Sequence, residues 1–187
     1  MTCIVSFIDK KKRTMWMASD SQSTDGWTST NLRGSKIIDL DHYLIGGCGF
    51  VRYGQIIAHG NNLPAPKGDL MAFMCSEFVA HIAKICSDSG FLRKKEELSE
   101  IPGGGNLLVL VNGRAFSVDS MFGVIESNKL YDVVGSGSQV ATGSLYCDNK
   151  RGFLEKNPKN SLSCAILAAK SCIWGVGGRI VIKNKKY

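Results

Sequence analysis

The sequence predicts an α+β fold in which two antiparallel sheets are covered by helix pairs, as a layered sandwich. Short strand-like runs occur in pairs joined by tight turns, which favours antiparallel pairing and excludes a doubly wound parallel sheet. Helical segments follow the first two hairpins, and two more precede the last strand, as in a layered α+β protein. A chain of 187 residues suits one domain with a well-buried core, so we expect residues 1–187 to form a single domain.

The first part of the chain reads as two hairpins and a helix. A strand-like run at 4–8 is joined by the basic turn 10–13 to a second strand at 14–19, and a polar loop follows at 20–26. Runs at 36–40 and 42–47 form the second hairpin around Asp41. The glycine-rich turn 46–49 then opens a helix at about Val51.

The second part begins after residues 61–68, which contain two prolines. Asp69 is a good N-cap for a helix in which six apolar residues recur at helical spacing: Leu70, Phe73, Met74, Phe78, Ile82 and Ile85. Runs at 107–111 and 114–118, joined by Asn-Gly, form the clearest hairpin. A strand at 130–134 leads through a Gly-Ser-Gly-Ser turn into a short helix. A longer helix at about 162–173 and a strand at 178–183 close the chain.

The composition is that of a soluble globular protein, with 44% hydrophobic and 21% charged residues. No continuous apolar run reaches the roughly 18 residues of a membrane span, and the charges at 9–13 interrupt any signal-peptide pattern. Seven cysteines lie in apolar contexts without a C-x-x-C pair, so we expect most of them to be core residues. The sequence therefore predicts a cytoplasmic protein without a membrane partner.

The net charge of +7 raises nucleic acid as a partner. The basic residues, however, lie in three separate clusters at 10–13, 93–95 and 183–186, and the second is followed at once by two glutamates. Solvated turns and helix ends explain such clusters better, so no nucleic-acid partner is expected.

Thr2 is the residue whose type and position most specifically suggest a catalytic role. If Met1 is removed, the free α-amine of Thr2 lies next to its own hydroxyl and can act as its base. Free α-amines have pKa values of about 7.7–8.0, so a neutral fraction exists at physiological pH. Taken alone this signal is weak, because in most chains that begin with Met-Thr the threonine has no catalytic role.

Four further residues complete a candidate site with Thr2. A lysine near the hydroxyl would favour the alkoxide, and a carboxylate would orient the lysine, which Lys36 and Asp20 could do. Ser136 could relay protons, and the backbone N–H of Gly49 at a helix start could stabilise an oxyanion. Separately, Asp20 could cap a turn and Lys36 could be a solvated strand residue; together the residues favour a site. The turn at 135–138 could also hold a phosphate, but it lacks the lysine of a P-loop.

The order and spacing of these segments resemble the proteasome β-subunit family of N-terminal nucleophile hydrolases, and most closely HslV-like peptidases. The resemblance covers nearly the whole chain and is strongest in five segments: Thr2–Val5, Ala18–Gly26, Ser35–Ile38, Ile45–Gly49 and Val134–Ser138.

The resemblance implies a four-layer αββα sandwich and a threonine-type peptidase. Thr2 would be both nucleophile and amine base, Lys36 and Asp20 would activate it, Ser136 would relay protons and Gly49 would supply the oxyanion hole. It also implies a homo-oligomeric ring, an unfolded protein or peptide as substrate and an ATPase unfoldase as partner. No cofactor is required, although a monovalent cation such as sodium would bind main-chain carbonyls at Ala169, Cys172 and Gly175.

The sequence departs from the family pattern in three places. The paired lysines are reduced to Ser35-Lys36, the glycine-rich turn is one residue short, and the usual acid is missing from residues 169–175. Activity also requires the removal of Met1. The alternative is therefore a catalytically silent component of a larger assembly, such as a virus particle. For the active alternative, Ser23, Gly34 and Ile38 match the family's specificity pocket and suggest tolerance of apolar side chains.

Overall fold

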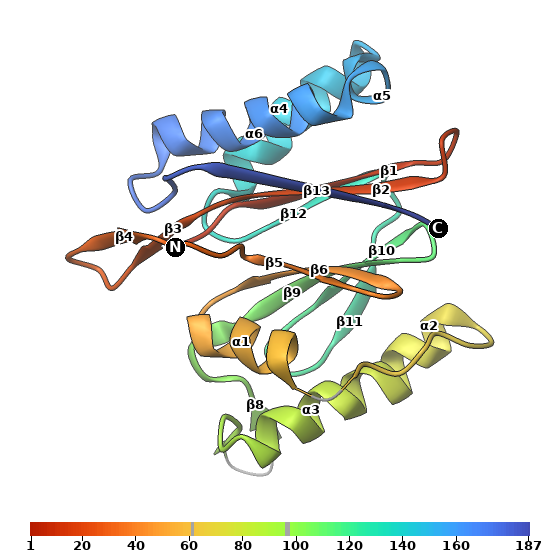
Figure 1. Ribbon diagram of the computed structural model, residues 1–187, viewed down its shortest axis with the longest axis vertical. Helices are drawn as coiled ribbons and strands as arrows, with labels where there is room; N and C mark the ends of the chain where they lie inside the picture. Colours follow the sequence, from red (N-terminus) through yellow and green to blue (C-terminus); the bar gives the residue numbers. More distant parts are fainter. Residues whose placement is uncertain (61, 96–97) are drawn as a thin grey trace.

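The structure is a computed structural model that describes residues 1–60, 62–95 and 98–187. It has four layers, with two sheets face to face and helices outside each (Figure 1). The first sheet has the strand order β12-β1-β2-β13 and is antiparallel throughout. Its strands and the helices that cover it are β1 (Ile4–Asp9), β2 (Thr14–Asp20), β12 (Tyr131–Val134), β13 (Ile180–Lys186), α4 (Ser138–Lys150), α5 (Phe153–Lys156) and α6 (Pro158–Cys172).

The second sheet has the order β11-β10-β9-β6-β5 and is also antiparallel. It consists of β5 (Ile37–Leu40), β6 (Tyr43–Cys48), β9 (Asn106–Val111), β10 (Arg114–Val118) and β11 (Val124–Glu126). Its outer face is covered by α1 (Val51–His59) and by a long helix composed of α2 (Leu70–Phe73), a π-helical turn (Met74–Phe78) and α3 (Val79–Asp88). The predicted αββα sandwich is confirmed.

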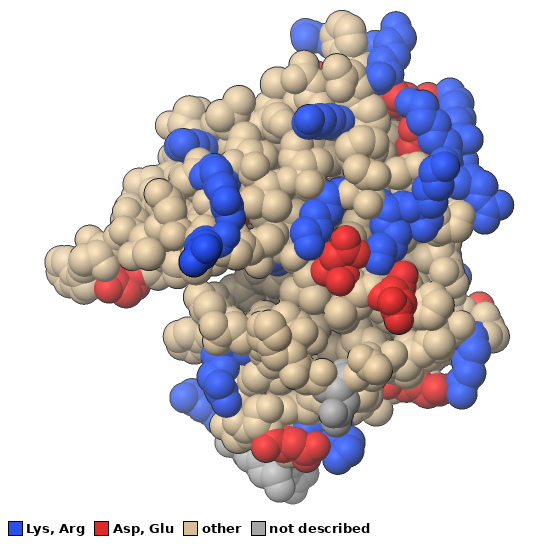
Figure 2. Space-filling model, viewed as in Figure 1, with Lys and Arg blue, Asp and Glu red and all other residues tan. Residues whose placement is uncertain are grey.

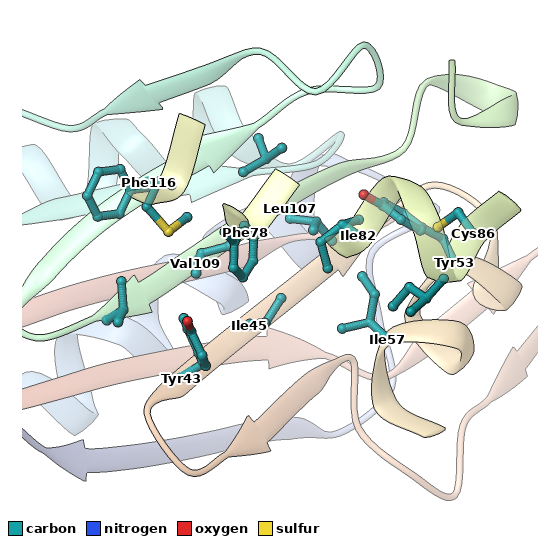
Figure 3. Close-up of a cluster of buried hydrophobic side chains, with 14 of the residues drawn as sticks. Tyr43, Ile45, Tyr53, Ile57, Phe78, Ile82, Cys86, Leu107, Val109 and Phe116 are labelled. Carbon is teal, nitrogen blue, oxygen red and sulfur yellow. The ribbon is translucent and has the colours of Figure 1, made fainter. Parts of the chain in front are cut away.

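Three layers of apolar side chains hold the sandwich together. The first lies between the two sheets and includes Ile4, Met17 and Leu108. The second joins the first sheet to α4–α6, and the third joins the second sheet to α1–α3, as Figure 3 shows for Tyr43, Phe78 and other residues of that layer. Because β1 is covered on both faces, all six of its residues are buried, which explains its nearly continuous apolar sequence.

Several details differ from the sequence prediction. The helix after Ser136 is not short: α4 has 13 residues. The polar loop at 20–26 contains the start of a two-stranded ribbon, β3 (Gln22–Thr24) with β4 (Ser29–Asn31), which projects from the sandwich (Figure 1). A second ribbon pairs β7 (Arg93–Lys95) with β8 (Leu98–Glu100), and a 3₁₀ turn follows at Pro102–Gly104. These ribbons are too short and polar for the period-2 pattern to reveal them.

One prediction from the composition is wrong, because most of the cysteines are not core residues. Only Cys3 and Cys86 are buried, whereas Cys75, Cys147, Cys164 and Cys172 are exposed on helices. The helical segment Leu70–Asp88, with a mean hydropathy of 1.4, is long and apolar enough to cross a membrane by length and composition. Its apolar stripe packs on the second sheet, as a core helix of a soluble protein also does.

Charge is distributed unequally between the two halves of the sandwich. Residues 1–20 and 129–187 carry the whole positive excess, because acidic residues outnumber basic ones between residues 21 and 128. Figure 2 shows Lys and Arg gathered at the end of the first-sheet half that Figure 1 places at the β1–β2 turn and α5. The cluster at 10–13 is an exposed turn, as predicted.

Candidate active site

The register of the first sheet brings Thr2 to its neighbours. Ile4 lies opposite Ser19 on one side and Val134 on the other. Continuing both ladders toward the N-terminus places Asp20 beside Cys3 and Ser136 beside Thr2. Accordingly, the Thr2 N–H donates to Ser136 Oγ at 3.1 Å, and Ser136 Oγ donates to the Thr2 carbonyl at 3.2 Å.

Gly135 makes this close approach feasible. It has φ +98°, and a Cβ there would lie against the Thr2 carbonyl. A side chain at this position would therefore push the turn away from Thr2 and adopt a strained backbone conformation. The Gly-Ser-Gly pattern is thus explained by packing against the N-terminal segment.

Lys36 and Asp20 form a buried ion pair beside the Thr2 hydroxyl. Lys36 Nζ lies 2.8 Å from Asp20 Oδ1 and 3.0 Å from Thr2 Oγ1, and the side chains of Lys36 and Asp20 are 8% and 1% exposed. Burial lowers the pKa of the Lys36 ammonium, while the nearby Asp20 carboxylate opposes that shift. The lysine therefore supplies a positive charge that reaches the hydroxyl with little screening by solvent.

Backbone amides fix the orientation of Asp20. Its Oδ1 accepts the Cys3 N–H at 3.0 Å, and its Oδ2 accepts the N–H groups of Gln22 and Gly177, each at 3.2 Å. Gly177 belongs to the turn between α6 and β13, so the carboxylate ties three segments together. A buried carboxylate with this many donors is held in one orientation.

Met1 covers the site in the unprocessed chain. Its carbonyl accepts the Thr2 hydroxyl at 2.7 Å and Lys36 Nζ at 3.2 Å, and its terminal amine donates to Thr24 Oγ1 at 3.2 Å. The Thr2 nitrogen is then an amide and has no basic lone pair. Removal of Met1 would place a free amine beside Ser136 Oγ and open the space that Met1 fills.

The first cavity lies between the β3–β4 ribbon and α1. It measures about 370 Å³, and Thr2 and Lys36 form part of its wall. The three positions that match the family's specificity pocket all line it: Ser23, Gly34 and Ile38. Leu32, Val51 and Ala58 add further apolar surface.

The second cavity shares Met1, Thr2 and Gly49 with the first and measures about 430 Å³. Thr2 and Ser136 form one wall, and the turns at Gly49 and Gly103-Gly104 form the other. Gly49 has φ +102°, and a Cβ there would lie 2.7 Å from the Gly105 Cα, so only glycine fits where the two turns pack. Gly49 lines both cavities, at the start of α1, where a backbone N–H could meet an oxyanion.

The predicted cation ligands lie at the end of α6. The Ala169 carbonyl accepts the Ile173 N–H at 2.9 Å, Cys172 is exposed, and Gly175 lies under the Met1 side chain. Their role in binding a cation stays a prediction.

The structure therefore brings Thr2, Asp20, Lys36 and Ser136 together and places Gly49 beside them. Sequence reasoning missed three contributors: the Gly177 amide, the Gly103-Gly104 turn and Asn106, which lines the second cavity. The triple glycine at 103–105 is the one visible signal for the turn in the sequence. No local pattern indicates Gly177 or Asn106.

No protein-family model matches the sequence, and no curated protein matches it. Solved structures match nearly the whole chain. BPH from Thiobacillus denitrificans in complex with epoxomicin has a TM-score of 0.75 at 15% identity, with 99% of this chain and 98% of that chain covered. BPH from the same organism has the same score and coverage at 14% identity. HslV from Trypanosoma brucei has a TM-score of 0.66 at 14% identity and covers both chains completely.

At such low sequence identity, the structural similarity establishes the fold alone. The chemistry must be argued from the residues of the site. The four-layer sandwich, the position of Thr2 at the head of β1 and the full-length structural matches agree with one another. This chain has the same fold as the BPH and HslV structures.

Proposed function

We propose that the chain is a threonine-type peptidase that becomes active when Met1 is removed. One observation carries the proposal: the Thr2 hydroxyl lies 3.0 Å from a buried lysine that is itself paired with a buried carboxylate. If Lys36 were only a solvated strand residue and Asp20 only the cap of a turn, the two side chains would not need to be buried and paired beside the Thr2 hydroxyl. Pairing and burial of both charges are costly unless the geometry is good, so such a pair marks a candidate functional site.

The mechanism follows from the positions of the groups. The free Thr2 amine accepts the hydroxyl proton, Thr2 Oγ1 attacks the scissile carbonyl, and the N–H of Gly49 stabilises the oxyanion. The amine then returns the proton to the leaving amine, which leaves an ester on Thr2. Water, deprotonated by the same amine, hydrolyses that ester and regenerates Thr2. Lys36 keeps the proton affinity of the amine low, and Ser136 orients the amine.

The surroundings of the reaction are part of the proposal. The apolar wall of the first cavity suits unfolded peptides with apolar side chains before the scissile bond. From the resemblance we further propose a cytoplasmic homo-oligomeric ring, a partner ATPase unfoldase and a monovalent cation at the Ala169, Cys172 and Gly175 carbonyls. Light scattering tests the ring: a stable monomer at micromolar concentration would contradict it.

The decisive experiment is intact-mass spectrometry of the natively produced protein, followed by treatment with a threonine-directed electrophile. Epoxomicin, the ligand in one of the BPH structures, is the first reagent to test. We expect a chain that starts at Thr2 and gains one equivalent of the reagent, and we expect Thr2→Ala to lose both labelling and peptide hydrolysis. A chain that keeps Met1 quantitatively in its native assembly has no amine base. That result would favour the alternative, a silent structural component.

A further inference from the structure

The second cavity contains a polar side chain to which the proposed mechanism gives no task. Asn106 is the first residue of β9 and lies opposite Cys48 in β6. Along β9, Leu108 and Leu110 face the first sheet, whereas Leu107 and Val109 face α1–α3. Because side chains alternate along a strand, Asn106 faces the first sheet, at the end of the inter-sheet core near Thr2.

The Asn106 carboxamide makes no hydrogen bond to any residue that the structure describes, although the residue is half-buried. A carboxamide has both a donor and an acceptor, which match the C=O and N–H of a peptide unit. Such a group facing a cavity beside a nucleophile is suited to hold an extended peptide backbone.

The wall next to Asn106 has almost no side chains. Gly103 and Gly104 both have positive φ, at +72° and +67°, and both are exposed at the edge of the cavity. A Cβ added at Gly104 would meet nothing within 4 Å, so a side chain there would extend into open space. The cleft is therefore wide on this side because glycines form its wall.

The first cavity holds the positions that match the specificity pocket, whereas the second contains Ser136, which accepts the N–H of Thr2, the nitrogen that would protonate the leaving amine. We propose that the second cavity binds the part of a peptide that follows the scissile bond. Asn106 is a positioning residue for its backbone, and the Gly103-Gly104 turn leaves room for its first side chain. This inference rests on the proposed function and assigns the leaving-group side of the same site.

The experiment compares two substrates of the Met1-free protein with the same apolar residues before the cleaved bond. One ends in an aminocoumarin amide, and the other continues for four residues beyond the cleaved bond. We expect Asn106→Ala to lower kcat/KM for the extended peptide by about 3- to 10-fold, the worth of one neutral hydrogen bond, and to leave the aminocoumarin amide unchanged. Most of this loss should be an increase in KM, and kcat/KM of Asn106→Gln should lie between those of Asn106→Ala and the unsubstituted protein.

Gly104→Asn tests the glycine wall. Asparagine is chosen because it tolerates positive φ, so we expect the fold to be preserved. We expect it to discriminate against extended peptides with a bulky residue directly after the cleaved bond, and not against those with glycine there. Asn184→Ala, an exposed asparagine on β13, is the matched control and should change neither substrate.

The outcomes separate the two proposals. Equal losses on both substrates, or no loss on either, would overturn the assignment of the second cavity while the peptidase stands. If the Met1-free protein hydrolyses neither substrate, the proposed function fails, and the assignment falls with it.

Discussion

Two parts of the site around Thr2 are built by different means. Beside the Thr2 hydroxyl, Lys36 and Asp20 form a buried ion pair that hydrogen bonds from backbone amides hold in place. In the second cavity, the Gly103-Gly104 turn contributes backbone and open space, and Gly49 lines both cavities. The first sheet, with Lys36 at the edge of the second, therefore supplies the electrostatics, whereas the glycine turns supply access. Damage to the two parts should look different for this reason.

The largest effect is expected for Asp20→Ala. Removing the carboxylate leaves Lys36 buried without its partner and frees the amides of Cys3, Gln22 and Gly177. We expect a loss of about 3–5 kcal/mol in the free energy of unfolding, as for other broken buried ion pairs. Peptide hydrolysis should fall by at least about 100-fold, since the charge beside the hydroxyl is no longer oriented. Urea unfolding and steady-state kinetics measure the two losses.

Asp25→Ala is the matched control for that variant. Asp25 also accepts three hydrogen bonds, two from Thr28 and one from the Trp27 N–H, which lower its pKa to about 2. It lies at the exposed tip of the β3–β4 ribbon, where water can replace the lost partner. Its removal should change stability far less than Asp20→Ala. Equal losses would show that hydrogen-bond number, and not burial, makes Asp20 important.

A smaller effect is expected for Gly49→Ala, at the turn that lines both cavities. The new Cβ would approach the Gly105 Cα at 2.7 Å in a backbone conformation with φ +102°. We expect a loss of about 1–3 kcal/mol of stability from the strained backbone and a lower kcat, because the turn must move. Gly143→Ala, in α4 with open space around it, should instead stabilise the protein by about 0.5–1 kcal/mol. A Gly49→Ala variant with normal kcat would remove that residue from the oxyanion hole.

The smallest effect concerns the pH dependence of stability. Because burial lowers the pKa of Lys36 in the folded protein, the unfolded chain binds more protons between that pKa and the ordinary value of about 10.4. The stability of the wild type relative to Lys36→Met should therefore rise with pH in this window, by at most about 1.4 kcal/mol per pH unit. Urea unfolding of both proteins from pH 8 to pH 10 measures this difference. A falling difference would mean that Asp20 outweighs burial.

Most of the fold could be predicted from the sequence alone. Hairpin pairs separated by helical stripes are local patterns, because strand and helix periodicity and turn residues act over a few neighbours. They predicted the two sheets, the order of the layers and the hairpins 36–47 and 107–118, which the structure has at 37–48 and 106–118. The same local view failed for the exposed cysteines. An apolar neighbourhood in sequence does not say which helix face meets the core.

The candidate site likewise has one part that the sequence predicts and another that only the structure shows. Thr2, Asp20, Lys36 and Ser136 could be named from the sequence because each has a chemical type that the mechanism requires and a place at the end of a predicted strand. Only the tertiary structure decided that the Gly177 amide meets Asp20 and that Asn106 shares a cavity with Thr2. Those contacts join segments far apart in the chain through the register and spacing of two packed sheets, and no local pattern encodes that spacing.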